Sequence, residues 1–170
     1  MPKTTWVDAI ALAFGGDQLV PYVATRRELI PAILELLGLQ EGDVFYDLGC
    51  GDGRVAIEAA KRYPVKRAVC VEVNPSLAMG ALERAKLEGV ADRVLVLNED
   101  MRHVDLSDAD AVYMYLLTSI NELMRPKLER ELKPGARVVT LDFQIPGWKP
   151  YRVVGEPGWQ KTLYLYIKRV

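Results

Sequence analysis

The stretch "YDLGCGDGRVAIEAA", residues 46–60, decides how the rest of the chain is interpreted. Gly49, Gly51 and Gly53 alternate with other residues, and they stand between an apolar run and a segment with helical periodicity. Glycine lets a backbone turn tightly and lie close to a ligand. Because the loop follows an expected strand and opens an expected helix, we interpret it as a binding loop rather than as a plain turn.

The spacing of the glycines indicates which ligand the loop suits. A dinucleotide fingerprint reads GxGxxG, whereas this loop reads GxGxG, and no GK[ST] follows it as in a Walker loop. Asp47 stands two residues before the first glycine. An acid at that place suits a ligand with a cationic end better than a pyrophosphate. S-adenosylmethionine, which carries an ammonium and a sulfonium, is such a ligand.

Strand and helix patterns alternate around this loop. Val-rich strands are predicted at 43–48, 67–73, 93–98, 110–116 and 136–142, and helices at 53–62, 74–88 and 119–132. Only a loop joins the third and fourth strands. Two further strands, at 151–155 and 161–170, are predicted to form an antiparallel pair at one edge of the sheet. The pattern predicts a parallel sheet covered on both faces, with a ligand at the carboxyl ends of its strands.

Helix-start signals refine the boundaries. Asn74 precedes Pro75, which predicts a capped helix start. Thr25 with Glu28, and Ser119 with Glu122, have the spacing of a capping box. With a further short helix at about 5–14, the chain is expected to be one domain, 1–170. Residues 1–40 would form N-terminal helices that cap the ligand site, and 41–170 the core sheet.

Two acids follow the second and third strands. Glu72 ends the second strand, where a carboxylate can accept hydrogen bonds from both hydroxyls of a ribose. Asp100 follows the third strand and can accept from an adenine amino group. The alternatives are a solvated acid at a strand end for Glu72 and an ordinary turn residue for Asp100.

Composition limits the remaining classes. A net charge of −1 over 170 residues argues against a dedicated nucleic-acid binder. Cys50 and Cys70 form no CxxC, so neither a disulfide framework nor a zinc site is expected, and no metal is predicted. Reduced cysteines favour the cytoplasm. No apolar run approaches the length of a membrane span, so no membrane association is expected.

Taken together, these residues resemble the class I S-adenosylmethionine-dependent methyltransferases. More specifically, the chain is similar to the small archaeal protein lysine methyltransferases and to the eukaryotic lysine methyltransferase of the ATP synthase c-subunit. The resemblance rests on "VPYV" (20–23), "DLGCGDGR" (47–54), "EVNP" (72–75), "YMYLLTSINELMRPKLERELKPGARVV" (113–139) and "IPGW" (145–148). It implies a Rossmann-like α/β fold with a mostly parallel, doubly wound sheet, a C-terminal antiparallel edge and a minimal set of helices.

The resemblance also implies an activity and a set of site residues. The activity is methyl transfer from S-adenosylmethionine to lysine side chains of proteins, with broad specificity. The implied cofactor-binding residues are Asp47, Gly49, Gly51, Gly53, Glu72, Asp100 and Thr25. Tyr22 and Thr25 are placed at the mouth of the cofactor and acceptor site. Ala24 and Thr118 stand where many members have proline. Both positions flank the expected acceptor side, so these departures bear on substrate choice more than on cofactor binding.

The end of the fourth strand informs the acceptor. The segment "YMYLLTS" has no acid or Asn followed by prolines, which argues against methylation of adenine or of a glutamine amide. A lysine amine must be neutral to react, and a desolvated site lowers its ordinary pKa of about 10.4. We therefore predict Tyr115 and Tyr22 as acceptor residues that act by positioning. The alternatives are packing at the strand end for Tyr115 and stapling of the next helix for Tyr22.

Several questions stay open from the sequence. A methyltransferase for RNA or for a small molecule is the enzymatic alternative, and a cofactor-binding interaction module without turnover is the non-enzymatic one. The expected partners are proteins that present exposed lysines, with no nucleic acid, and the chain is expected to be a monomer. The sequence does not decide whether His103 or Asp142 contributes to the acceptor site.

Overall fold

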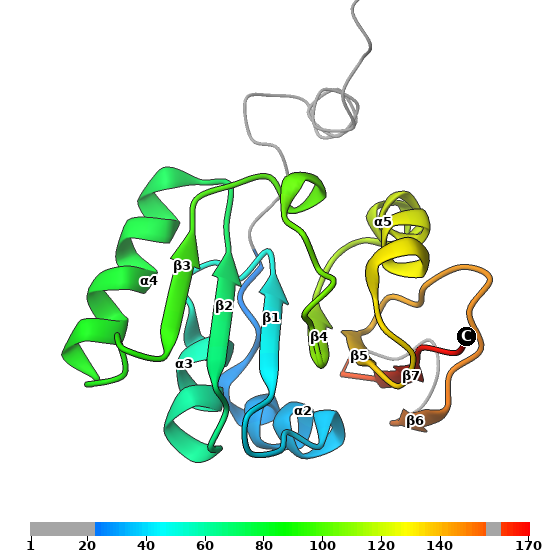
Figure 1. Ribbon diagram of the computed structural model, residues 1–170, viewed down its shortest axis with the longest axis horizontal. Helices are drawn as coiled ribbons and strands as arrows, with labels where there is room; N and C mark the ends of the chain where they lie inside the picture. The colour runs from blue at the N-terminus through cyan, green and yellow to red at the C-terminus, as the bar shows by residue number, and fades with distance from the viewer. Residues whose placement is uncertain (1–22, 156–160) are drawn as a thin grey trace, which may run out of the picture.

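A computed structural model describes residues 23–155 and 161–170 of the chain. Seven strands form one sheet in the order β3-β2-β1-β4-β5-β7-β6 (Figure 1). The strands are β1 (Val44–Leu48), β2 (Arg67–Val71), β3 (Val94–Leu97), β4 (Ala111–Met114), β5 (Arg137–Leu141), β6 (Arg152–Val154) and β7 (Leu163–Ile167). The first five are mutually parallel, whereas β7 is antiparallel to both β5 and β6. The predicted fold class, including the antiparallel edge, is confirmed.

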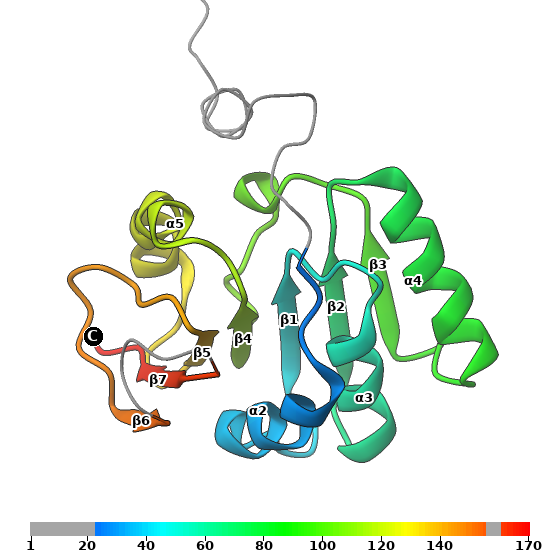
Figure 2. The same ribbon diagram turned by 180° about the vertical axis from the view of Figure 1, so that it is seen from behind.

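Helices cover both faces of the sheet. They are η1 (Arg27–Leu29), α2 (Ile30–Leu37), α3 (Arg54–Arg62), α4 (Pro75–Leu87), η2 (Met101–His103) and α5 (Thr118–Glu131). Buried residues of α2, α3 and α4 form one apolar cluster with the sheet, and those of α5 form a second cluster on the other face. Figure 2 shows α3 in front of the strands and α2 near the lower ends of β1 and β4. All residues of β1 and β4 are buried, as are all but the first residue of β2 and of β5, which explains the continuous apolar sequences of these strands. The edge strand β3 is less covered, and its Leu95 is exposed.

The strand order places the ligand crevice. The chain runs outward from β1 to β2 and β3, then returns to lay β4 on the other side of β1. Ligands bind outside the carboxyl ends of the strands at such a reversal. The sequence predicts only a loop between β3 and β4, and within the described residues this connection contains the three-residue η2. The crevice therefore lies above β1 and β4, where the glycine loop leaves the sheet.

Two of the three predicted helix starts differ from the structure. Asn74 caps α4 as predicted, because its side chain accepts a hydrogen bond from the N–H of Leu77. The capping boxes at Thr25 and Ser119 are wrong: α2 follows η1 and begins at Ile30, and α5 begins at Thr118 after an N-cap residue without a side-chain cap. The expected helix at 5–14 lies outside the described residues, and the division into 1–40 and 41–170 stays a prediction.

The two cysteines are bonded to each other, so the expectation of reduced cysteines is wrong. Cys50 and Cys70 form a disulfide with 5.3 Å between their Cα atoms, across 20 positions of sequence. Both residues are buried in the apolar cluster beneath α3. The argument from cysteine usage for the cytoplasm therefore falls away. In residues 23–155 and 161–170, no helix is both long and apolar enough to cross a membrane.

Candidate functional site

The glycine loop follows β1 and leads into α3. Gly49, Gly51 and Gly53 all have left-handed backbone conformations, with φ of 77°, 58° and 81°. A Cβ at Gly53 would also lie 2.9 Å from the Cβ of Ala81 on α4. The turn and the helix packing therefore require glycine here, in addition to any need for the backbone to lie close to a ligand. The N–H groups of Gly49 and Cys50 donate to the carbonyl of Val71, which fixes the loop on β2.

Glu72 connects this loop to the start of α4. One carboxylate oxygen accepts from the N–H of Gly51 and the other from the N–H of Asn74, both at 2.9 Å. The side chain is buried, and it lies at the carboxyl end of β2. A carboxylate oxygen can accept two hydrogen bonds, so each oxygen retains capacity for a ligand hydroxyl. The residue can thus hold a ribose while it orders the loop.

Asp47 lies inside the sheet beneath the loop. It is in register with Cys70 of β2 and Tyr113 of β4, so the three occupy one row across the sheet. Burial raises the pKa of Asp47 well above its usual value, and the charges of Glu72 and Asp52 raise it further. A buried carboxyl among acids is stabilised by a cation. This place therefore suits a ligand with a positive charge, which is the end of S-adenosylmethionine that carries the ammonium.

Asp100 follows β3 and begins η2. Its side chain accepts from the N–H of Arg102, and it pairs with the guanidinium of the same residue at 2.8 Å. This local capping arrangement accounts for an acid at position 100 without a ligand. The residue still lies at the carboxyl edge, next to the end of β3. A contact with adenine would add to these interactions.

Thr25 lies at the crevice through a contact that the sequence analysis missed. Its hydroxyl is 2.8 Å from the hydroxyl of Tyr113, and both residues are buried. The carbonyl of Thr25 accepts from Arg54, which also pairs with Asp52 in the glycine loop. The segment before α2 is therefore fixed to β4 and to the loop. The available signal was that Tyr113 lies two residues before Tyr115, and so on the same face of the strand.

Tyr115 lies just beyond β4, where its ring stacks on that of Phe143 with 6.3 Å between the centroids. Burial, and then the charge of Asp142, raises the pKa of Tyr115, so its hydroxyl stays protonated. Asp142 has a φ of 63° and accepts from the N–H of Thr162. The amide of Asn121 on α5 donates to the carbonyl of Phe143. Tyr22, the other predicted acceptor residue, lies outside the described residues.

Tyr113→Phe is expected to weaken cofactor binding about five- to tenfold, because it removes a hydrogen bond worth about 1 kcal/mol that holds Thr25 at the crevice. Calorimetric titration with S-adenosylmethionine measures this change. Tyr166→Phe is the matched control, since its hydroxyl also makes a buried contact, with the N–H of Ile145, on the other face of the sheet. Equal losses of affinity in both variants would contradict a role for Tyr113 in positioning.

The arrangement of the glycine loop, Glu72 and the buried Asp47 at the switch point defines a class I S-adenosylmethionine-dependent methyltransferase. A solved structure described as an RNA methyltransferase from Salinibacter ruber in complex with S-adenosyl-L-homocysteine has the same fold, with a TM-score of 0.82. It is 40% identical in sequence, and the match covers 86% of this chain and 94% of that one. The methyl donor is thus S-adenosylmethionine.

The chain belongs to the family of the ANTKMT methyltransferase domain, whose model matches residues 47–152. It is 45% identical over 150 residues to a protein-lysine N-methyltransferase of Saccharolobus islandicus, covering 87% of this chain and 93% of that protein. It is 37% identical over 137 residues to an adenine nucleotide translocase lysine N-methyltransferase of Mus musculus, covering 81% of this chain. The chain spans only 59% of the length of the mouse protein.

Proposed function

We propose that this chain transfers a methyl group from S-adenosylmethionine to the side-chain amine of lysine residues in proteins. The observation that carries this proposal is the 45% identity, across 93% of its length, with an archaeal protein described as a protein-lysine N-methyltransferase. The stacked pair Tyr115 and Phe143 supports it, because the pair gives the edge of the crevice an aromatic wall. An aromatic wall removes water from an amine and tolerates a cationic product.

The cofactor would be held by residues from three strand ends and from the segment before α2. Its ribose is assigned to Glu72, its adenine to Asp100 and its cationic methionine end to the neighbourhood of Asp47. The full proposed set is Thr25, Asp47, Gly49, Gly51, Gly53, Glu72 and Asp100. The left-handed loop supports this assignment, since it brings the backbone itself to the crevice.

When bound, the cofactor supplies an electrophilic methyl group on a sulfonium, which leaves as a neutral thioether. The residues of the chain need only orient and desolvate the amine, because the reaction is a direct displacement. Tyr115 keeps its proton, since its pKa is raised, and its hydroxyl oxygen can accept a hydrogen bond from the neutral amine. Tyr22 is proposed to act at the same acceptor site.

We further propose that the enzyme is monomeric and accepts exposed lysines of many proteins. Action in the cytoplasm stays a prediction, without the support that reduced cysteines would have given it. Broad specificity is supported by the way the acceptor residues act. Positioning by aromatic rings recognises the lysine side chain itself rather than the residues directly next to it. Asp142 and His103 are given no catalytic role, because Asp142 bonds to Thr162 and direct displacement needs no base once the amine is neutral.

RNA methylation is the second candidate. It is favoured by the likeness to the Salinibacter ruber structure, which is described as an RNA methyltransferase. The net charge of −1 counts against it, because binding to phosphates draws its affinity from basic side chains. One experiment can separate the two substrates, because protein and RNA fractions of the same lysate can be labelled in parallel.

The test supplies methyl-labelled S-adenosylmethionine to the purified enzyme with unmethylated lysate protein and, separately, with RNA. Mass spectrometry should locate label on many protein lysines. Glu72→Ala should abolish the labelling, since it removes the bridge between the loop and α4, whereas the exposed Glu83→Ala should leave it unchanged. Label confined to RNA would replace the lysine proposal by the second candidate. Label in neither fraction would contradict both.

A further inference from the structure

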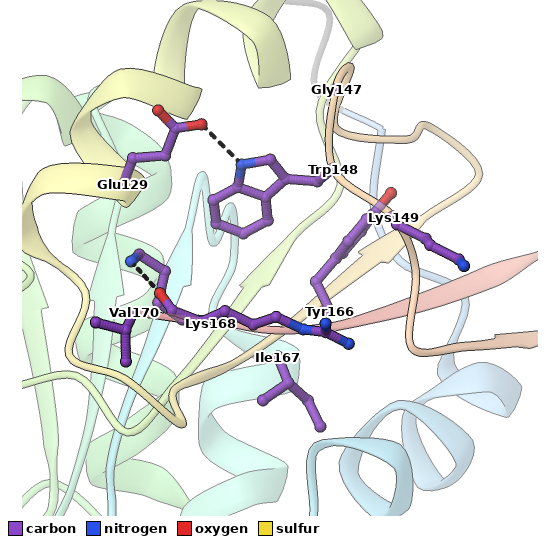
Figure 3. A pocket seen from close by; sticks show the side chains of 9 residues that line it. Glu129, Gly147, Trp148, Lys149, Tyr166, Ile167, Lys168 and Val170 are labelled. Atoms are coloured by element: carbon purple, nitrogen blue, oxygen red, sulfur yellow. Dashed lines mark hydrogen bonds between the residues drawn. The ribbon is translucent and has the colours of Figure 1, made fainter.

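A groove lies on the side of the molecule away from the glycine loop. It has a volume of about 470 Å³ and is formed by α5, the loop after β5 and the end of β7 (Figure 3). Ile167 at the end of β7 pairs with Arg137, the first residue of β5. The glycine loop, by contrast, leaves the carboxyl end of the parallel strands. The groove is therefore separate from the methyl-transfer crevice, at the opposite edge of the sheet.

Basic side chains dominate the lining of this groove. Lys149 comes from the loop after β5, and Lys168 and Arg169 follow β7. Within residues 23–155 and 161–170, no carboxylate lies within ion-pair distance of any of the three. The acid in the lining, Glu129, accepts from the indole N–H of Trp148 at 3.0 Å instead. The lining therefore carries a net positive charge, with three basic side chains and one acidic side chain.

The wall of the groove is aromatic and fixed in place. The rings of Trp148 and Tyr166 meet edge to face with 5.9 Å between their centroids. The bond to Glu129 holds the indole from α5, as Figure 3 shows. Aromatic surfaces with nearby cations are typical of binding sites for peptides and for bases. A preformed wall lowers the entropy that a ligand must lose on binding.

The neighbouring strand favours a peptide over a nucleic acid. The loop that carries Trp148 and Lys149 runs directly into β6, the outermost strand of the sheet. All residues of β6 are exposed, as is Tyr151, whose side chain is 67% accessible. An exposed edge strand can pair with an extended chain, and alternate side chains of that chain then reach adjacent pockets. Positive charge beside a peptide-binding edge is complementary to acidic side chains.

We propose that this groove binds an acidic segment of the protein substrate at a distance from the target lysine. The proposal rests on the proposed protein-lysine methylation. It also predicts the distance in sequence between the acidic segment and the target lysine. The groove lies at the start of β5 and the acceptor site at the end of β5, and this strand has 5 residues. A strand of that length spans about 17 Å, and an extended peptide covers the same distance in about five residues. Favoured lysines should therefore have acidic residues five or more positions away.

The test compares two peptides that carry one lysine and, six positions away, either three glutamates or three glutamines. The wild-type enzyme should have a KM about tenfold lower for the acidic peptide, with similar kcat. In the charge-reversed variant Lys149→Glu/Arg169→Glu the two KM values should converge, while the glutamine peptide is methylated as before. Both substituted residues are exposed, so folding is not at risk. Lys66→Glu/Lys86→Glu, with the same change in charge at exposed positions elsewhere, should retain the preference.

The outcomes separate this inference from the proposed function. Methylation of both peptides without preference, or a preference that survives charge reversal, would overturn the inference and leave the proposed function intact. Methylation of neither peptide would overturn the proposed function. In that case, the acidic peptide can be given a fluorescent label, and its fluorescence anisotropy still measures binding to the groove. Loss of single-stranded RNA binding on charge reversal, with peptide binding unchanged, would assign the groove to RNA instead.

Discussion

Breaking the bond between Cys50 and Cys70 is expected to lower the free energy of unfolding by about 3 kcal/mol. The bond closes a loop across 20 positions of sequence, and its main effect is to restrict the unfolded chain. For a chain of this size, such a loss corresponds to a decrease in Tm of roughly 6–12 °C. Urea unfolding of the wild-type protein with and without a dithiol reductant measures the difference.

Cys70→Ala provides the control for this measurement. The variant lacks the bond under all conditions, so the reductant should not change its stability further. The remaining difference in the free energy of unfolding between this variant and the reduced wild-type protein measures the packing of the Cys70 side chain, which is fully buried. Two free thiols in unreduced, denatured wild-type protein would contradict the bond, as would a urea midpoint that does not respond to the reductant.

The disulfide also shows where sequence reasoning stops. Cys50 and Cys70 stand 20 positions apart without a recognised spacing, and nothing local relates them. They meet because β1 and β2 are paired and the glycine loop folds back onto Val71. The strands were predicted correctly, and so was the position of the loop between β1 and α3. Only the turn of the loop, which depends on three left-handed glycines, brings the two sulfur atoms together.

Thr25 and Tyr113 illustrate the same limit for hydrogen bonds. The capping box is a local pattern, and it predicted that the Thr25 side chain bonds to a backbone N–H within one turn. In the fold its hydroxyl instead meets that of a residue 88 positions away, on β4. Asn74 does cap its helix. Pro75 already favours a helix start at this position, and the Asn74 side chain accepts a hydrogen bond from the N–H of Leu77, three residues later. Local signals hold where no distant partner competes.

The parts of the site that the sequence predicted share a simple origin. Glu72 and the glycine loop were placed from strand ends, because the carboxyl ends of parallel strands meet at one edge of a sheet. Their placement at that edge agrees with the structure. The structure adds the burial of Asp47 and its row with Cys70 and Tyr113, which follows from the register of three strands. Register is set by tertiary packing and was not readable from the local pattern.

S-adenosylmethionine should bind more tightly as the pH is raised, by up to tenfold for each pH unit below the pKa of Asp47. Burial, and then Glu72 and Asp52, raises that pKa well above its usual value, so the carboxyl is protonated over a wider pH range in the cofactor-free protein. A cationic ligand favours the ionised form, and binding therefore releases a proton. Calorimetry in two buffers with different heats of ionisation measures the release.

Asp47→Asn separates this linkage from other effects of pH. The amide has nearly the same shape and does not titrate, so cofactor binding by the variant should release no proton from this position. Its affinity should be about 10- to 100-fold weaker, as expected when an interaction of about 1.5–3 kcal/mol with a charged group is lost. The range from about pH 5 to 7 suits the test, because the α-ammonium of the ligand itself titrates above it, near 8. A wild-type affinity that does not change over this range would contradict the assignment.

The same substitution should stabilise the cofactor-free protein at neutral pH. A carboxyl whose pKa is raised on folding contributes its stability below the unfolded value of about 3.9, and that contribution is lost as the pH rises through the folded pKa. The amide of the Asp47→Asn variant would avoid this loss, so urea unfolding should show a gain over the wild-type protein that grows with pH. A variant that is more stable and binds its cofactor less tightly would indicate that Asp47 is retained for binding. If the variant were instead less stable at neutral pH, the carboxylate would serve the fold, and the cationic end of the cofactor would have to be bound elsewhere.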